Sequence, residues 1–391
     1  MIDLVVLGAG RWAHECWAPL LLEFADRYRV AAVVDPQLPH ARSLAAALAL
    51  PEAAAHAELA AALAAAPRVT AAVVLSSPEE HADCILAAAA AGLDVLTEKP
   101  LVTTRADAVR VAAAVARAGI KVAVVQNYRY QHRIQEARRR LATGDFGALH
   151  YVVARFAADY RVPGSWDVGN AHTMSDPLLV EGSIHHFDMI RYLAGRDVLA
   201  VTAATANPVG SSFAGDCIGG FLLHLTGGAF ALYEATLQAA GDQSRWRDEL
   251  YRLELQHGSI TCKGPAVTVT HGGRHTAIEA PDRDMFTGHR HLVAGFADWL
   301  ADGPPVETTL TDNLRSLAVL FAALDSARTA ATVAVRELTS PERAGADGTV
   351  ADHRASQRLS PDSTAVADDV VTGVAVLPDA ADSRSTTAQL P

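Results

Sequence analysis

The first residues of the chain decide its fold: Ile2-Asp3-Leu4-Val5-Val6-Leu7 runs directly into Gly8-Ala9-Gly10-Arg11-Trp12-Ala13. The apolar run predicts a buried strand, and the residues after it have the G-x-G-x-x-G/A spacing. In such a turn Gly8 permits a tight bend, Gly10 lets a pyrophosphate approach the backbone, and the small Ala13 lets helix and strand pack closely. The pattern predicts a dinucleotide-binding turn, with a purely structural strand–helix turn as the alternative.

The same alternation of strand and helix continues to about residue 126. Further buried strands are expected at 30–34, 69–75, 94–97 and 121–125. Helices are expected near 11–25, 39–49, 57–66, 79–91 and 104–118. Strands that alternate with helices predict right-handed crossovers and a parallel sheet with helices on both faces. The nearly continuous apolar character of the strands fits a sheet buried on both sides.

The pattern changes after residue 127. Helices are expected at 131–143 and 181–194, and β-rich segments at 200–206, 216–225, 229–237, 250–256 and 266–270. Two closing helices are expected near 288–302 and 311–331. This predicts an α+β domain with an open, mostly antiparallel sheet over 127–338. Residues 339–391 contain no Phe, Tyr or Trp and are expected to form a disordered tail.

Composition excludes several classes of function. With 33 Lys and Arg against 44 Asp and Glu, the net charge of the 391 residues is -11, which argues against a dedicated nucleic-acid or membrane-surface protein. No apolar run reaches the length of a membrane-spanning helix, and the first residues lack the features of a signal peptide. The four cysteines form no CxxC pair. A cytoplasmic protein is therefore expected.

Asp35 ends the second expected strand. A carboxylate at this position accepts hydrogen bonds from a ribose 2′-OH and repels a 2′-phosphate. The sequence therefore favours NAD over NADP as the cofactor.

The segment Thr97-Glu98-Lys99-Pro100 closes another expected strand, at the sheet edge where open α/β sheets bind ligands. A lysine there could stabilise a developing alkoxide. Pro100 fixes the turn, and a cis peptide bond before it would aim Lys99 into the cleft. The alternative is a surface Glu-Lys pair.

The expected helix at 181–194 places Glu181, His185 and Asp188 on one face. A histidine accepts a proton near neutral pH, and a carboxylate one turn away can orient it. A metal site is an alternative reading of this cluster. Because His186 points about 100° away from His185 on a helix, no metal is predicted. A solvated polar helix face is the other alternative.

Taken together, these residues resemble the Gfo/Idh/MocA family, the glucose-fructose oxidoreductase and inositol dehydrogenase group. The resemblance covers about residues 1–338. It rests on the order and spacing of five segments: Gly8-Ala9-Gly10-Arg11-Trp12-Ala13, Ser77-Pro78-Glu79-Glu80-His81, Gly92-Leu93-Asp94-Val95-Leu96-Thr97-Glu98-Lys99-Pro100, Gln126-Asn127-Tyr128-Arg129-Tyr130, and Glu181 through Gly195.

The resemblance implies an N-terminal Rossmann domain (1–126) and a C-terminal α/β domain that often mediates homodimers or homotetramers. It also implies NAD(P)-dependent oxidation or reduction of a sugar or cyclitol hydroxyl, with Lys99 and His185 as the catalytic lysine and histidine. Glu181 stands where the family has an aspartate, and Ser183 where it has a glycine. The longer Glu181 can still orient His185 or contact a substrate hydroxyl.

Two sets of binding residues are expected. The cofactor set is Gly8, Gly10, Arg11, Trp12, Ala13, Asp35, Ser76, Pro78, His81, Glu98, Lys99 and Asn127. The substrate set is Lys99, Tyr128, Arg129, Tyr160, Arg161, Trp166, His172, Glu181 and His185, because aromatic and polar side chains suit a polyol.

Three functions remain open on the sequence alone. The first is an NAD-dependent dehydrogenase or reductase of a sugar, aminosugar or cyclitol, in which His185 removes the hydroxyl proton and Lys99 binds the oxyanion. The second oxidises a ring carbon transiently to permit glycoside cleavage or elimination, and recycles NAD. The third is a non-catalytic NAD-binding scaffold, against which the presence of both Lys99 and His185 argues.

Overall fold

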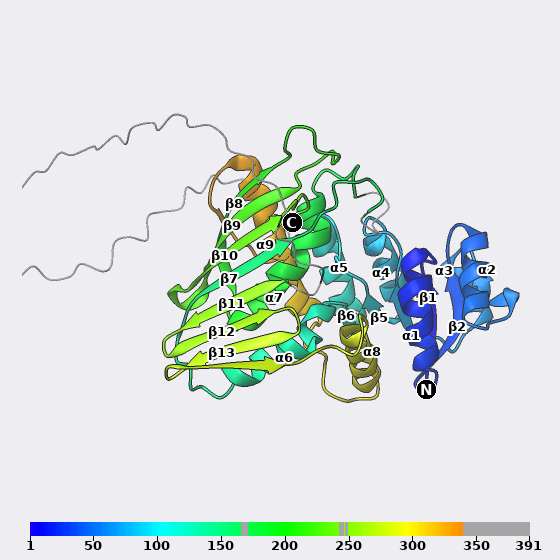
Figure 1. Cartoon of the computed structure of the whole chain (residues 1–391). Helices are drawn as coiled ribbons and strands as arrows, with labels where there is room; N and C mark the ends of the chain where they lie inside the picture. The colour runs from blue at the N-terminus through cyan, green and yellow to red at the C-terminus, as the bar shows by residue number, and fades with distance from the viewer. Residues whose placement is uncertain (166–170, 242–245, 247–248, 339–391) are drawn as a thin grey trace, which may run out of the picture. The chain divides into compact units, whose positions relative to one another are not determined.

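The computed structural model describes residues 1–165, 171–241, 246 and 249–338, which belong to one compact unit (Figure 1). Two sheets organise this unit, one of six strands and one of nine. The predicted tail, 339–391, and Trp166 lie outside the described residues.

The first sheet is parallel throughout, in the order β3-β2-β1-β4-β5-β6. Its strands are β1 (Ile2–Leu7), β2 (Tyr28–Val34), β3 (Ala55–His56), β4 (Ala71–Val74), β5 (Asp94–Thr97) and β6 (Val122–Val124). All four residues of β4 are buried, as the apolar runs predict for a sheet covered on both faces. The predicted parallel α/β architecture is confirmed, and β3 is a short edge strand that the sequence did not indicate.

Helices connect these strands. They are the π-helical turn η1 (Ala13–Trp17), α1 (Ala18–Glu23), α2 (Leu38–Ala47), α3 (Leu59–Ala65), α4 (His81–Ala90) and α5 (Arg105–Ala118). In α5 the Thr104 side chain accepts the Asp107 N–H at the start, and left-handed Gly119 ends the helix. Among the described residues, no helix is both long enough and apolar enough to cross a membrane.

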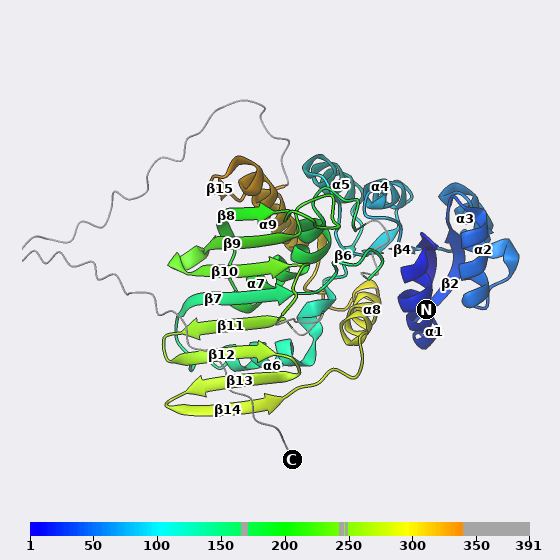
Figure 2. The same ribbon diagram turned by 45° about the horizontal axis from the view of Figure 1, so that its top comes forward.

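The second sheet has the order β14-β13-β12-β11-β7-β10-β9-β8-β15 and is antiparallel except between β7 and β10. Its strands are β7 (Leu149–Ala157), β8 (Val198–Ala206), β9 (Ile218–Leu225), β10 (Phe230–Thr236), β11 (Leu250–Leu255), β12 (Gly258–Lys263), β13 (Ala266–His271), β14 (Arg274–Glu279) and β15 (Val333–Ala334). The predicted open, mostly antiparallel sheet is confirmed (Figure 2).

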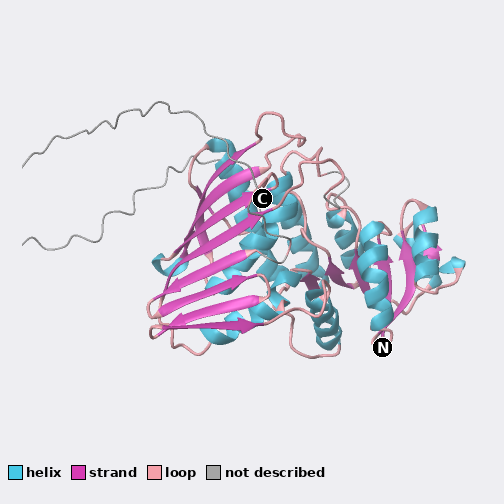
Figure 3. Ribbon diagram, viewed as in Figure 1, coloured by secondary structure: helices cyan, strands magenta, loops and turns pink. Residues whose placement is uncertain are grey.

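The remaining helices are unevenly distributed around this sheet. They are the 3-10 turn η3 (Asn127–Tyr130), α6 (His132–Leu141), the π-helical turn η4 (Leu178–Ser183), α7 (Ile184–Ala194), α8 (Thr287–Leu300) and α9 (Leu310–Thr329). Helices α6, α7 and α9 cover one face, and no helix of the described residues covers the other, which we call the bare face (Figure 3). Alternate residues of β10 are accordingly buried and exposed.

Helix α8 differs from the prediction that both late helices close the second domain. Its residues Leu292, Val293 and Phe296 join the core around β1 and α1. The Tyr28 hydroxyl donates a hydrogen bond to the Val293 carbonyl at 2.7 Å. The periodicity of the segment predicted the helix, but its apolar stripe carries no information on which of two cores it enters.

Candidate active site

Lys99 follows β5, at the carboxyl edge of the parallel sheet, and its peptide bond to Pro100 is cis, as the sequence suggested. Its Nζ donates to Oε2 of Glu181 at 2.9 Å and to the backbone carbonyl of Glu181 at 3.3 Å. The two side chains are 18% and 7% exposed. The structure therefore brings Lys99, which follows a strand of the first sheet, and Glu181, which belongs to the layer of the second sheet, together in a largely buried ion pair.

Glu181 and His185 do not lie on one regular helix. The sequence predicts an α-helix over 181–194, but the structure has the π-helical turn η4 up to Ser183 and an α-helix only after it. The wider turn directs the Glu181 carboxylate to Lys99. The buried Nδ1 of His185 has no hydrogen-bond partner within the described part of the chain. The predicted Glu181–His185 contact is thus replaced by the ion pair, and π-turns of this kind are frequent at functional sites.

His185 is buried and stacked on Tyr128, with ring centroids 4.2 Å apart and planes 7° from parallel. Burial, and next the positive charge of Lys99, hold the pKa of His185 well below its ordinary value of 6.5. The imidazole is therefore neutral at neutral pH and can accept a proton.

Arg129 does not offer the predicted substrate contact. Its Nε lies 2.7 Å and its Nη2 2.5 Å from the two carboxylate oxygens of Asp188, and Nη2 also pairs with Asp312. Nη1 donates to the Glu307 carbonyl at 3.5 Å. This buried network replaces the substrate role expected of Arg129 and removes Asp188 from the predicted reactive face. It also fixes the segment that carries Tyr128.

The glycine turn fits a dinucleotide. Gly8 has φ +98°, and a Cβ there would lie 2.4 Å from the Ser76 backbone nitrogen, so only glycine is tolerated. A Cβ at Gly10 would meet nothing within 4 Å, which leaves open space where a pyrophosphate would approach. Ala13 is fully buried. Asp35 accepts the Ala9 N–H at 2.9 Å, so its carboxylate lies beside the turn, as a ribose ligand requires.

Two residues of the predicted cofactor set are engaged with each other. Oε1 of Glu98 accepts the indole N–H groups of Trp12 at 2.8 Å and Trp17 at 2.9 Å, and Oε2 accepts the Lys99 N–H at 3.2 Å. Burial alone would raise the pKa of Glu98, but His289 and the two indole donors lower it to about 2. The Glu98 carboxylate therefore ties the first helix to the turn that carries Lys99.

Five other predicted cofactor residues have the following contacts or exposure. The His81 ring lies between the carbonyl oxygens of Pro100, at 2.7 Å from Nδ1, and Ser76, at 3.1 Å from Nε2. Burial lowers the pKa of His81. Asn127 Nδ2 is 3.3 Å from Nδ1 of His289. Arg11 forms an exposed ion pair with Glu15, and Pro78 is half-buried before α4.

His289 was missed by the sequence interpretation, because it lies on α8, which the sequence placed with the other sheet. Its neighbour Gly288 approaches the Asn127 carbonyl so closely that a Cβ would lie 1.9 Å away. A glycine directly before a histidine was the only available signal.

The remaining predicted substrate residues lie in the loop after β7. Nε2 of His172 is 2.9 Å from the Tyr160 carbonyl. Arg161 pairs with Asp159 at 2.7 Å and is exposed. The Tyr160 ring lies 6.5 Å from Trp246, which in turn lies 6.4 Å from the His185 ring. Trp246 was not predicted, because a single tryptophan in a loop carries no sequence pattern.

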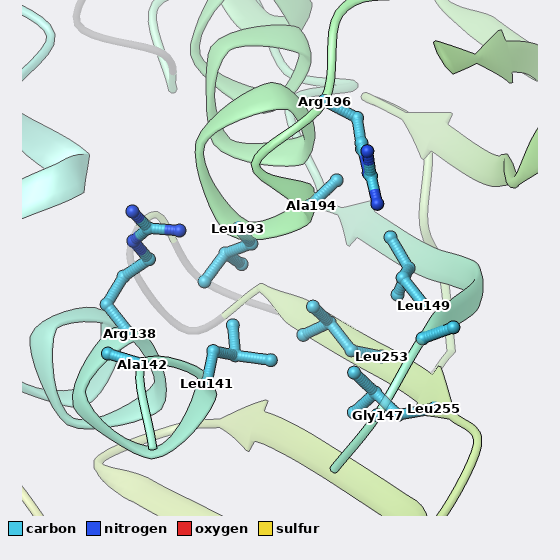
Figure 4. Close-up of a pocket in the computed structure, with 11 residues that line it drawn as sticks. Arg138, Leu141, Ala142, Gly147, Leu149, Leu193, Ala194, Arg196, Leu253 and Leu255 are labelled. Atoms are coloured by element: carbon cyan, nitrogen blue, oxygen red, sulfur yellow. The ribbon is translucent and has the colours of Figure 1, made fainter. Parts of the chain in front are cut away.

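A cavity of about 250 Å³ lies at the other end of α7, where Leu193 and Ala194 face the strands (Figure 4). Lys99, Glu181 and His185 do not line it. The arginines at its rim, Arg138 and Arg196, lie at the C-terminal ends of α6 and α7, where helix dipoles favour cations. Within the described ranges no group of three or more His, Cys, Asp or Glu side chains is arranged to hold a metal ion.

Comparison with protein families gives two matches. The model described as an oxidoreductase family with an NAD-binding Rossmann fold matches residues 2–126. The model described as the GFO/IDH/MocA C-terminal domain matches residues 134–261.

Individual proteins agree with these matches. A D-apiose dehydrogenase of Paraburkholderia graminis is 27% identical over 265 residues, which are 63% of this chain and 68% of that protein. An inositol 2-dehydrogenase of Streptomyces avermitilis is 32% identical over 213 residues, 53% of this chain and 57% of that protein. An oxidoreductase of Agrobacterium radiobacter, solved with NAD+, L-tartaric acid and magnesium, shares the fold with a TM-score of 0.76 at 20% identity, covering 85% of this chain and 98% of its own. The chain belongs to the Gfo/Idh/MocA family of oxidoreductases, and its N-terminal Rossmann domain is an NAD-binding domain.

Proposed function

We propose that this protein is an NAD-dependent dehydrogenase or reductase that interconverts a ring hydroxyl and a ketone of a sugar, aminosugar or cyclitol. The observation that carries the proposal is the convergence of Lys99, Glu181 and His185 at the carboxyl edge of the parallel sheet. An ammonium group and a neutral imidazole, both largely buried, are the pair of groups that alcohol oxidation requires.

Bound NAD supplies the hydride acceptor. Since Nδ1 of His185 is buried, Nε2 is the nitrogen left to accept the hydroxyl proton. Lys99 donates a hydrogen bond to the oxygen as negative charge develops there. Glu181 balances the charge of Lys99 and holds its Nζ in place. The hydroxyl proton thus goes to His185 and the hydride to the cofactor, and reduction is the reverse of these steps.

The charges of the site favour a neutral substrate. Among the described residues, Lys99 is balanced by Glu181, Arg129 by Asp188 and Asp312, and Arg161 by Asp159. Cations already paired in this way do not attract a phosphate or carboxylate strongly. The names of two relatives, D-apiose dehydrogenase and inositol 2-dehydrogenase, also denote uncharged polyols.

The experiment is a panel of neutral sugars, aminosugars, glycosides, inositols, sugar acids and sugar phosphates, with NAD, at alkaline pH. NADH accumulation with a neutral polyol is the expected result. Conversion of a glycoside without net NADH would instead support the NAD-recycling function. NAD binding without turnover of any compound in the panel would support a scaffold. NADP in place of NAD is the matched control, and we expect Asp35 to disfavour it.

We also propose that the protein forms a homodimer or homotetramer through the bare face of the nine-stranded sheet. Phe230 is 37% and Leu232 45% exposed on β10, and the Phe230 ring stacks on Tyr151 of the neighbouring β7 at 5.3 Å. These neighbouring apolar and aromatic side chains supply the exposed apolar surface on which the proposal rests. Light scattering coupled to size exclusion is expected to show a dimer or tetramer, and Leu232→Glu to give a monomer. A monomeric wild-type protein would contradict this proposal.

A further inference from the structure

A chain of buried polar side chains lies behind the proposed active site, and the mechanism above does not use it. The Tyr233 hydroxyl on β10 lies 3.1 Å from Oγ of Ser183 and 2.5 Å from Nδ1 of His186. Nε2 of His186 lies 3.6 Å from Oε1 of Glu249, which is an electrostatic contact and too long for a hydrogen bond. Ser183, His186 and Glu249 are fully buried, and Tyr233 is nearly so.

One end of this chain carries a fixed charge. Arg133 donates to Oε2 of Glu249 at 2.9 Å and to the Glu249 carbonyl at 2.8 Å, so its guanidinium is the counter-ion of this buried carboxylate. A carboxylate facing Nε2 favours a proton on that nitrogen, which leaves Nδ1 as an acceptor. Burial raises the pKa of Tyr233, so the phenol keeps its proton and donates it to Nδ1. Ser183 must then donate to the Tyr233 oxygen. The two hydrogen bonds are therefore donated in one direction, from Ser183 to Tyr233 and from Tyr233 to His186.

The other end of the chain reaches the elements that carry the reactive groups. Ser183 is the last residue of η4, two residues after Glu181, and His186 directly follows His185 on the first turn of α7. Adjacent helical residues point about 100° apart, so a ring fixed at 186 sets the direction of the ring at 185. His185 needs such support, because its own Nδ1 has no hydrogen-bond partner in the described structure.

We propose that His186 and Tyr233 are positioning residues: their hydrogen bonds to each other and to Ser183, together with the contact between His186 and Glu249, hold the first turn of α7 in the register that points His185 at Lys99. This inference rests on the proposed dehydrogenase function. The link acts only through the helix, and neither side chain contacts the reacting atoms.

The test compares Tyr233→Phe with Tyr251→Phe in the full chain. Tyr251 is a matched control, because it is fully buried on β11 of the same sheet, separated from β10 by β7, and its hydroxyl has no hydrogen-bond partner among the described residues. We expect Tyr233→Phe to lower kcat by about 10- to 100-fold, with the KM of the polyol and the Kd of NAD within about twofold, because small misplacements near the reacting atoms are this costly. Tyr251→Phe should retain wild-type kcat. Equal kcat in all three proteins would overturn the proposal.

A double-mutant cycle shows whether the effect passes through His185. In the His185→Ala background, Tyr233→Phe should cause no further loss of kcat, whereas an independent effect would multiply with that of His185→Ala. A multiplied loss would overturn the proposal. If Tyr233→Phe does not fold, Ser183→Ala cuts the same chain at its other end and should lower kcat with the same dependence on His185. All comparisons need a wild-type protein that turns over a polyol, so failure of the dehydrogenase function is recognised in the first measurement.

Discussion

The ammonium of Lys99 lies 2.9 Å from the carboxylate of Glu181. This contact joins the end of β5, in the parallel sheet, to the π-helical turn η4, which packs with the second sheet. Two residues 82 positions apart in the sequence thereby hold each other in place. Both side chains are largely buried, so solvent screens their attraction only weakly. The pair therefore fixes where the cation stands relative to the substrate oxygen.

The first prediction concerns Glu181→Gln. The amide retains the length of the side chain but loses the charge, so Lys99 keeps an acceptor and loses its counter-ion. We expect kcat to fall about 10- to 100-fold, because Lys99 is held less firmly once its counter-ion is lost. Glu181→Asp keeps the charge but is one methylene shorter, and should retain more activity than Gln if charge dominates. Steady-state kinetics of the two variants against exposed Glu79→Gln decide this, and wild-type kcat in Glu181→Gln would contradict it.

The second prediction assigns the chemical roles. His185→Ala and Lys99→Ala should each lower turnover by at least about 10²-fold, the usual contribution of a positioned acid or base. The Kd of NAD should change little in His185→Ala, since the imidazole stacks on Tyr128 rather than on the glycine turn. Turnover and NAD titration are measured on the same preparations. Retention of turnover in both variants would exclude these roles.

The third prediction is a pH profile. Because the folded protein holds the pKa of His185 well below 6.5, the imidazole stays neutral, and able to accept a proton, on the acid side of that value. The kcat/KM of oxidation should therefore remain constant from pH 7.5 down through about 6.5 and fall only at lower pH. The same lowered pKa affects the free energy of unfolding, because the unfolded chain protonates His185 more readily than the folded protein does. The contribution of His185 to stability is present above pH 6.5 and is lost as pH falls through the lowered pKa. An acid limb centred above pH 6.5 would contradict this assignment.

Much of the fold was predictable from the sequence, because most of its strands have a local pattern of apolar residues. Short apolar runs next to helical stretches gave the parallel sheet, whose strands are buried on both faces. The hairpin strand β14 was not predicted, since its residues Arg274–Glu279 are mostly exposed and show no apolar alternation. The position of α8 was also not predictable, because an apolar stripe does not specify which core it enters.

The candidate site also has parts that local sequence patterns predict and parts that depend on tertiary contacts. The sequence predicted Lys99 and His185 from their motifs, and in the structure the charge of Lys99 acts on the buried His185 ring. It did not indicate the direction of Glu181, which depends on a π-turn and so on tertiary contacts. It also could not show that Arg129 is internally paired, because Asp188 and Asp312 meet it only in the folded chain. His289 and Trp246 stand in no motif, and only their packing reveals them.

The fourth prediction tests the Arg129 network. Arg129 is 3% exposed, and replacing it by Met leaves the Asp188 carboxylate buried with its main counter-ion removed. Breaking one side of such a pair costs about 3–5 kcal/mol of unfolding free energy. Arg110→Ala is the control: it breaks an exposed pair with Asp107 and should cost about 0–1 kcal/mol. Urea denaturation measures both, and equal losses would show that Arg129 is no more important than a surface arginine.

The fifth prediction concerns the choice between NAD and NADP. The Asp35 carboxylate lies at the end of β2, beside the glycine turn, and its negative charge opposes a 2′-phosphate. Asp35→Asn removes the charge and the oxygen that accepts the Gln37 N–H at 2.8 Å, but keeps an oxygen that can accept the Ala9 N–H, whereas Asp35→Ala removes the charge and both acceptors. We expect the ratio of the NADP Kd to the NAD Kd to fall at least about tenfold in Asp35→Asn, which corresponds to about 1.4 kcal/mol of lost discrimination. Asp35→Ala should in addition weaken NAD, since the turn loses its acceptor. Titration of both cofactors needs no substrate, so the result is independent of the reaction. An unchanged ratio in Asp35→Asn would place the discrimination elsewhere in the cofactor site.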